Sequence, residues 1–99
     1  MEYGIYNFAD HKQGTTLNEK TFTFSAHPSG LLTNVILSTN KGNILREGEG
    51  ITIVDATNWT FTIDAQVINW NLEKNSYVIK TVSSHGVAKD FIRGDWTII

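Results

Sequence analysis

The sequence predicts an all-β fold, arranged as an antiparallel sandwich of about seven or eight strands in one domain, residues 1–99. Apolar and polar residues alternate over several short segments, as expected for strands with one buried face. Residues typical of turns, mainly Gly, Asn and Asp, separate these segments. No segment repeats apolar residues at helical spacing through three turns. These three observations predict an all-β chain, which a sandwich fits better than a closed barrel.

The clearest strand signal is Thr21–Ala26, where Phe22, Phe24 and Ala26 share one face. The next strand, Leu31–Thr39, is apolar on both faces at its centre, which predicts a central position in the sheet. Further strands are expected at Ile44–Arg46, Ile51–Val54, Trp59–Ile63, Ser76–Ser83, Val87–Ile92 and Trp96–Ile99. Ile51–Val54 and Trp59–Ile63, separated by the turn Asp55–Asn58, are expected to form a hairpin.

Two segments and one glycine carry less direct signals. Ala65–Ile68 fits either an edge strand or one helical turn capped by Asp64. His85-Gly86 is placed where a tight hairpin turn needs a positive φ, and Gly94 predicts a bulge before the last strand.

The parity of the alternating strands predicts the core, which comprises Phe22, Phe24, Trp59, Phe61, Ile63, Tyr77, Ile79 and Trp96.

Composition excludes several classes of protein. Eight Lys and Arg against ten Asp and Glu give a net charge of −2, whereas nucleic-acid binders and proteins of anionic membranes carry a basic excess. The chain has no Cys, so it has neither disulfides nor thiolate zinc sites. No apolar run approaches the roughly 20 residues that span a bilayer, and the first residues lack the basic-then-apolar pattern of a signal peptide. We therefore expect no nucleic acid and no membrane among the partners.

Candidate chemical groups are scattered. The three histidines, His11, His27 and His85, lie in predicted loops without further ligands at metal spacing. The carboxylates of Glu47–Gly50 and Asp55 match no calcium loop, and residues within a tight turn, such as Ser83 and His85, rarely adopt triad geometry. We predict no catalytic residue, no metal, no cofactor and no enzymatic activity.

The tryptophans divide into two groups. Trp59 and Trp96 lie in alternating strands and are expected in the core. Trp70 lies between Asn69 and Asn71, and this context fits an exposed contact residue as well as a plug at the end of the sandwich.

Several segments together resemble a known family over nearly the whole chain. The segments are Asn7–Thr16, Thr21–Phe24, Gly50–Asp55, Trp59–Ile63, Tyr77–Lys80, His85-Gly86 and Phe91–Ile98. Their order resembles small phage proteins related to the N-terminal domain of the siphophage baseplate upper protein. The closing segment Phe91–Ile98 is the most specific part of the resemblance.

The resemblance implies an immunoglobulin-like β-sandwich and a non-enzymatic structural role in a phage virion. The chain would be a baseplate or tail component, or a capsid decoration subunit, that assembles in the host cytoplasm and is then located in the virion. Its partners would be other phage structural proteins or further copies of the same chain. The alternative from another class is a carbohydrate-binding β-sandwich module that uses an exposed Trp70.

Uncharged apolar segments at both ends of the chain predict the surface for such contacts. The N-terminal residues Tyr3 to Ala9 and the C-terminal Trp96–Ile99 carry no charge. Exposed to water, these two segments would form apolar surfaces prone to association. Each segment is therefore expected to pair within the fold or against a neighbouring protein subunit. The candidate protein-contact residues are Tyr3, Ile5, Tyr6, Phe8, Trp70 and Ile98.

Overall fold

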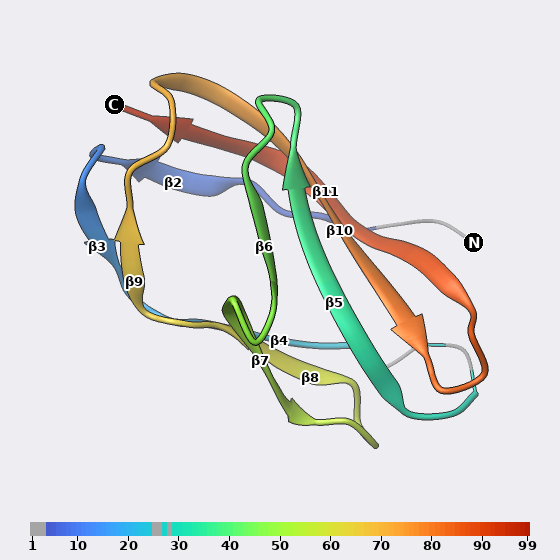
Figure 1. The fold of residues 1–99 in the computed structure, drawn as a ribbon. Coiled ribbons are helices and arrows are strands. Elements are labelled where there is room, and N and C mark those ends of the chain that lie inside the picture. Colours follow the sequence, from blue (N-terminus) through green and yellow to red (C-terminus); the bar gives the residue numbers. More distant parts are fainter. Residues whose placement is uncertain (1–3, 25–26, 28) are drawn as a thin grey trace.

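A computed structural model describes residues 4–24, 27 and 29–99, and all regular secondary structure in these residues is β-strand (Figure 1). The all-β prediction is confirmed. The strands are β1 (Gly4–Ile5), β2 (Phe8–His11), β3 (Thr15–Leu17), β4 (Lys20–Thr23), β5 (Leu32–Thr39), β6 (Ile44–Glu47), β7 (Gly50–Asp55), β8 (Thr60–Ile63), β9 (Gln66–Ile68), β10 (Glu73–Ser83) and β11 (Ala88–Ile98). The strands β1, β2 and β3 are not among those expected from the sequence. The two strands expected at Val87–Ile92 and Trp96–Ile99 are one continuous strand, β11.

The strands form one large mixed sheet and one small sheet. The large sheet has nine strands in the order β1-β11-β10-β5-β6-β7-β8-β4, and β2 also pairs with β11. β3 and β9 form the small antiparallel sheet. The large sheet curls into a half-barrel around the core (Figure 1). The expectation of antiparallel pairing throughout is wrong, because β1 and β2 pair in parallel with β11, and β6 pairs in parallel with β7. The two-layer, immunoglobulin-like arrangement expected from the sequence stays a prediction.

The core lies inside this curl and follows the predicted parity. Six of the eight predicted core residues are buried, namely Trp59, Phe61, Ile63, Tyr77, Ile79 and Trp96. Phe22 and Phe24 are partly buried and pack against the same cluster. The predicted central strand is also confirmed, since β5 lies between β10 and β6 and buries both Val35 and Leu37. Alternation therefore identified the inward face correctly, because a strand places every second side chain on the same side.

The predicted bulge at Gly94 is wrong. In the β10–β11 pair, Gly94 lies directly opposite Tyr77, and the register shifts instead where Ile79 faces Ile92 and Lys80 faces Asp90. Phe91 is thus the extra residue. An extra residue locally disrupts alternation, and Phe91 and Ile92 are both buried although they are adjacent in the chain.

Other local predictions hold. Ala65–Ile68 contains the strand β9, which pairs with β3, so the edge-strand alternative is confirmed. β7 and β8 form the expected antiparallel hairpin, and Gly86 has φ of 79° in the turn between β10 and β11. β8 begins one residue later than expected, because Trp59 has a positive φ of 52°. Within the described part of the chain, no helix has the length and apolar character to cross a membrane.

The N-terminal segment is built into the sheet. β1 and β2 both pair in parallel with β11, and the Tyr6 amide donates to the Arg93 carbonyl at 2.9 Å. Phe8 stacks on Trp96 with ring centroids 4.0 Å apart. The Tyr77 hydroxyl donates to the Tyr6 carbonyl, and burial raises the pKa of Tyr77. This segment therefore supplies both an edge of the sheet and part of its core.

The turn between β7 and β8 is organised by Asp55. Its carboxylate accepts hydrogen bonds from the backbone N–H groups of Thr57 and Asn58 at 3.1 and 3.2 Å, and from Asn58 Nδ2 at 2.7 Å. The Asn58 side chain, followed by the Asn58 backbone N–H, lowers the pKa of Asp55 below its ordinary value of 3.8. Because this pKa is depressed, ionised Asp55 stabilises the folded state fully when the pH is above the pKa that Asp55 has in the unfolded chain. The stabilisation is lost as the pH falls through the lower pKa of the folded state.

We expect an NMR titration of the Asp55 carboxyl carbon to show a midpoint below 3.8, and Asn58→Ala to move this midpoint upward. Asn18→Ala changes another exposed asparagine and is expected to leave the midpoint unchanged. An Asp55 midpoint that does not respond to Asn58→Ala would contradict the assigned cause.

Candidate functional site

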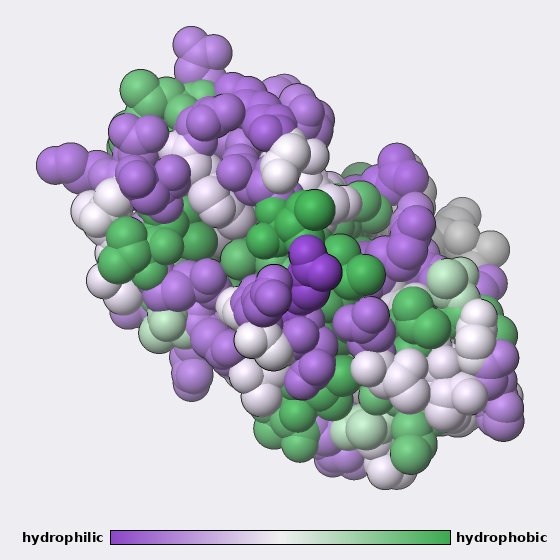
Figure 2. All heavy atoms as spheres, viewed as in Figure 1, coloured by the Kyte–Doolittle hydropathy of each residue, from purple (hydrophilic) through white to green (hydrophobic). Residues whose placement is uncertain are grey.

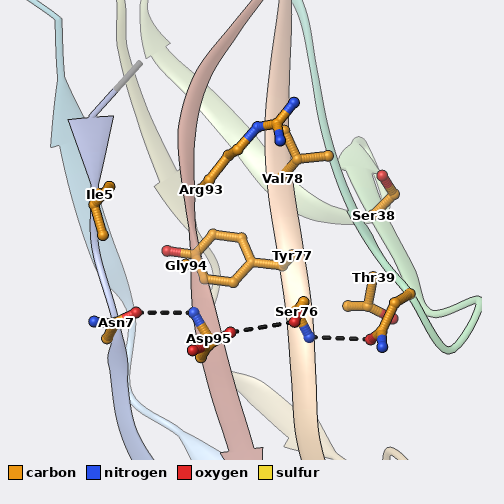
Figure 3. Close-up of a pocket in the computed structure, with 11 residues that line it drawn as sticks. Ile5, Asn7, Ser38, Thr39, Ser76, Tyr77, Val78, Arg93, Gly94 and Asp95 are labelled. Carbon is orange, nitrogen blue, oxygen red and sulfur yellow. Dashed lines mark hydrogen bonds between the residues drawn. The ribbon is translucent and has the colours of Figure 1, made fainter. Parts of the chain in front are cut away.

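An open hollow of about 640 Å³ lies where β1, β11, β10 and β5 run side by side. On β10, Ser76 and Val78 line the hollow, and the buried Tyr77 between them also borders it. The hollow is therefore on the outer face of the sheet, opposite the core. Its lining residues are Ile5, Asn7, Ser38, Thr39, Asn40, Ser76, Tyr77, Val78, Arg93, Gly94 and Asp95 (Figure 3).

Strand register aligns one row of these residues across the sheet. Ser38 of β5 is paired with Val78 of β10, Val78 with Arg93 of β11, and Arg93 with Ile5 of β1. The small side chain of Ser38 stands at one end of this row, and Ile5 stands at the other. The floor of the hollow therefore follows from sheet pairing between distant parts of the sequence.

Two asparagine side chains extend the sheet pairing where strands end. Asn40 follows β5, and its N–H donates to the Ser76 carbonyl at 2.9 Å while its Oδ1 accepts from the Ser76 N–H at 3.0 Å. Asn7 lies between β1 and β2, and its Oδ1 accepts from the Asp95 N–H at 2.9 Å. Each side-chain oxygen takes the place of a missing backbone acceptor. These bonds fix both asparagines relative to the strands (Figure 3).

Asp95 connects the two asparagines through Ser76. Ser76 Oγ donates to Asp95 Oδ1 at 3.2 Å, and Lys74 Nζ lies 3.8 Å from Asp95 Oδ2. A continuous line of hydrogen bonds therefore runs from Asn7 through Asp95 and Ser76 to Asn40 (Figure 3). Among the lining residues, the charged side chains are Arg93 and Asp95, which are opposite in sign.

The predicted contact residues are dispersed. Ile5 is 75% exposed and lines the hollow. Tyr6 packs edge-to-face on Phe8 and on Phe22, with ring centroids 5.0 and 5.5 Å apart. Phe8 and Ile98 are buried in the core, so they offer little surface to a partner. Tyr3 lies outside the described residues.

Trp70 is partly buried rather than fully exposed. Its ring packs edge-to-face on Trp96 at a centroid distance of 4.9 Å, and its carbonyl accepts a hydrogen bond from Gln13 Nε2 at 2.8 Å. Of the two alternatives for Trp70, these contacts favour packing at the end of the fold over an exposed contact residue. With these contacts, the Trp70 ring offers less free surface for stacking on a sugar than a fully exposed ring would.

The other candidate groups have structural contacts. His11 Nε2 lies 2.9 Å from the Thr15 carbonyl, and His27 stacks on Trp59. Ser83 Oγ accepts from the backbone N–H groups of His85 and Val87, so this hydroxyl organises the turn. Residues 4–24, 27 and 29–99 contain no group of three or more His, Cys, Asp or Glu arranged to hold a metal ion.

Sequence reasoning missed the residues that build the hollow. Asn7, Asn40, Ser76 and Asp95 come from separate segments and belong to no motif. Their only signal is that Ser76 and Asp95 fall on the outward parity of their strands. Comparison with protein-family models, with curated proteins and with solved structures finds no match for this chain.

Proposed function

We propose that this protein is a non-enzymatic structural subunit of a phage virion, either a baseplate or tail component or a capsid decoration protein, and that it acts by association with other virion proteins or with copies of itself. The resemblance of its segment order to the baseplate family supports this proposal. Contacts across the curl, such as Phe24 stacked on Phe91 at 4.5 Å, are compatible with the finer proposal of a two-layer, immunoglobulin-like sandwich.

The observation that carries the proposal is the pair of open sheet edges. β4 and β1 are the end strands of the large sheet, and each has one strand neighbour among the described strands. An open edge presents unpaired backbone groups to a strand of another chain. On β1 this edge carries Ile5, which is 75% exposed.

The rest of the surface also carries apolar residues suited to contacts. On the side where β5 and β6 lie in front, hydrophobic residues interrupt the hydrophilic surface in several places (Figure 2). The large hydrophobic residues that are exposed in the described part of the chain are Ile5, Tyr6, Leu31, Ile44, Val54, Val67, Leu72, Val87 and Ile99. Single exposed apolar residues are ordinary on proteins, so we assign the contact to Ile5, where exposure coincides with an open edge of the large sheet.

The direct test is quantitative mass spectrometry of purified particles of the phage whose genome encodes this chain. We expect the protein at a fixed ratio to the other virion proteins. Its presence in the infected-cell lysate but not in the particles would contradict the proposal. Particles without the protein, combined with binding of the purified protein to a glycan array, would favour the carbohydrate-binding alternative.

We expect Ile5→Lys to reduce incorporation into particles by at least tenfold while the fold is retained, because a charge at an open edge opposes strand addition. Val54→Lys is the matched control, since Val54 is 62% exposed but lies on β7, which has strand neighbours on both sides. Incorporation is measured by mass spectrometry and folding by circular dichroism. Equal incorporation of the two variants would place the contact elsewhere than the β1 edge.

A further inference from the structure

We propose that the hollow on the outer face of the sheet binds a neutral saccharide, through the hydrogen-bonded line of Asn7, Asp95, Ser76 and Asn40 together with the aliphatic side chains of Ile5 and Val78. This inference does not rest on the virion proposal: the saccharide would contact the face of the sheet, and Ile5 is the one residue that both proposals use.

The charges of the hollow favour a neutral ligand. Arg93 and Asp95 lie on the same strand two residues apart, so the lining carries one positive and one negative side chain. Arg93 is paired with Asp90 at 3.3 Å and Asp95 with Lys74 at 3.8 Å, so an ion of either sign would have to compete with an existing pair. A neutral molecule with many hydroxyl groups avoids this competition and can use the carboxylate as an acceptor.

The polar groups are complementary to hydroxyl groups. Ser76 Oγ and the Asp95 carboxylate lie together in the middle of the line, held by their bond of 3.2 Å. The amide oxygens of Asn7 and Asn40 are bonded to strand N–H groups, so these side chains are held in place before a ligand arrives. A sugar hydroxyl both donates and accepts a hydrogen bond, and it can therefore bind to carboxylate, hydroxyl and amide groups alike. Groups fixed in advance lose little conformational entropy on binding.

The position of the hollow disfavours an extended peptide as the ligand. A peptide that adds to a sheet bonds through its backbone to an open edge. The hollow instead lies over β10 and β11, which have hydrogen-bonded neighbours on both sides. Recognition there depends on side chains, and the aliphatic groups of Val78 and Ile5 can contact the C–H face of a sugar ring. The volume of about 640 Å³ is in the range of small-molecule sites.

The test is a titration of the ¹⁵N-labelled protein with the methyl glycosides of glucose, galactose, mannose and N-acetylglucosamine, followed by amide chemical shifts. Because the hollow is open, we expect dissociation constants of about 1 mM for the best of the four. The shifted amides should include Ser76, Gly94 and Asp95. Asp95→Asn preserves the size of the side chain and should weaken binding about tenfold, because it replaces a charge-assisted hydrogen bond by a neutral one.

Lys80→Gln is the matched control, since Lys80 lies on the outer face of β10 but does not line the hollow. It should leave the dissociation constant unchanged. Three results would overturn the inference: no shifts with any of the four glycosides, shifts centred on Trp70 instead of the hollow, or equal binding by the two variants. Absence of saccharide binding would not contradict the virion proposal. Incorporation into particles would not be evidence for the saccharide site.

Discussion

Phe61→Ala is expected to lower the free energy of unfolding by about 3–5 kcal/mol, because it removes a fully buried aromatic side chain and leaves a cavity. Phe61 is 0% exposed and lies on β8, next to the end strand β4. Its ring stacks on Phe22 at 5.4 Å and contacts Phe24 at 5.6 Å. β4 is an end strand paired only with β8 among the described strands, so the loss of these ring contacts also loosens the edge of the sheet.

Urea unfolding followed by tryptophan fluorescence measures the change from the shift in midpoint and the slope. Val54→Ala is the control on the adjacent strand β7, because Val54 is 62% exposed, and it should change the free energy of unfolding by less than about 0.5 kcal/mol. A change below about 1 kcal/mol for Phe61→Ala would place Phe61 at the surface and refute the register of β8 with β4.

The inward face of the fold could be predicted from the sequence because it depends on a local property. Alternation along Trp59–Ile63 and Ser76–Ser83 assigns each side chain to one face, whichever strand becomes the neighbour. The same reasoning fails at Phe91, where an extra residue in β11 places two consecutive side chains in the core. A bulge depends on the partner strand, and the β10–β11 register cannot be read from β11 alone.

The hollow could not be predicted because it depends on pairing between distant segments. Ile5 meets Arg93 only through the parallel pairing of β1 with β11, whereas the sequence predicts antiparallel strands. Asn7 and Asn40 take their places at strand interruptions whose positions follow from that pairing. The sequence shows two ordinary asparagines among several, and the fold makes these two part of the sheet.

The second large effect is expected at Gly94, where Gly94→Ala should lower the free energy of unfolding by at least about 3 kcal/mol. A Cβ at this position would overlap the Tyr6 carbonyl oxygen and carbon, which are backbone atoms and cannot turn aside as a side chain can. β1 and β2 would have to move away from β11. The displacement would break the hydrogen bonds from the Tyr77 hydroxyl to Tyr6 and from the Asp95 N–H to Asn7.

Gly42→Ala separates this clash from the general cost of replacing glycine. Gly42 has φ of 85° and open space around its Cβ position, so its substitution introduces backbone strain of about 1–2 kcal/mol without a contact. Gly94 has the opposite properties, a crowded Cβ position and no φ in the left-handed range. Urea unfolding compares the two variants, and hydrogen exchange should show loss of protection at Tyr6, whose N–H donates to Arg93, with protection kept in β5. If Gly94→Ala is no more destabilising than Gly42→Ala, the N-terminal segment does not pack on β11 as described.

If the larger effect and the local loss of protection occur together, the close approach of the N-terminal strand to β11 requires a glycine at position 94. Removal of residues 1–8 is then expected to destabilise the core, because the stack of Phe8 on Trp96 is lost.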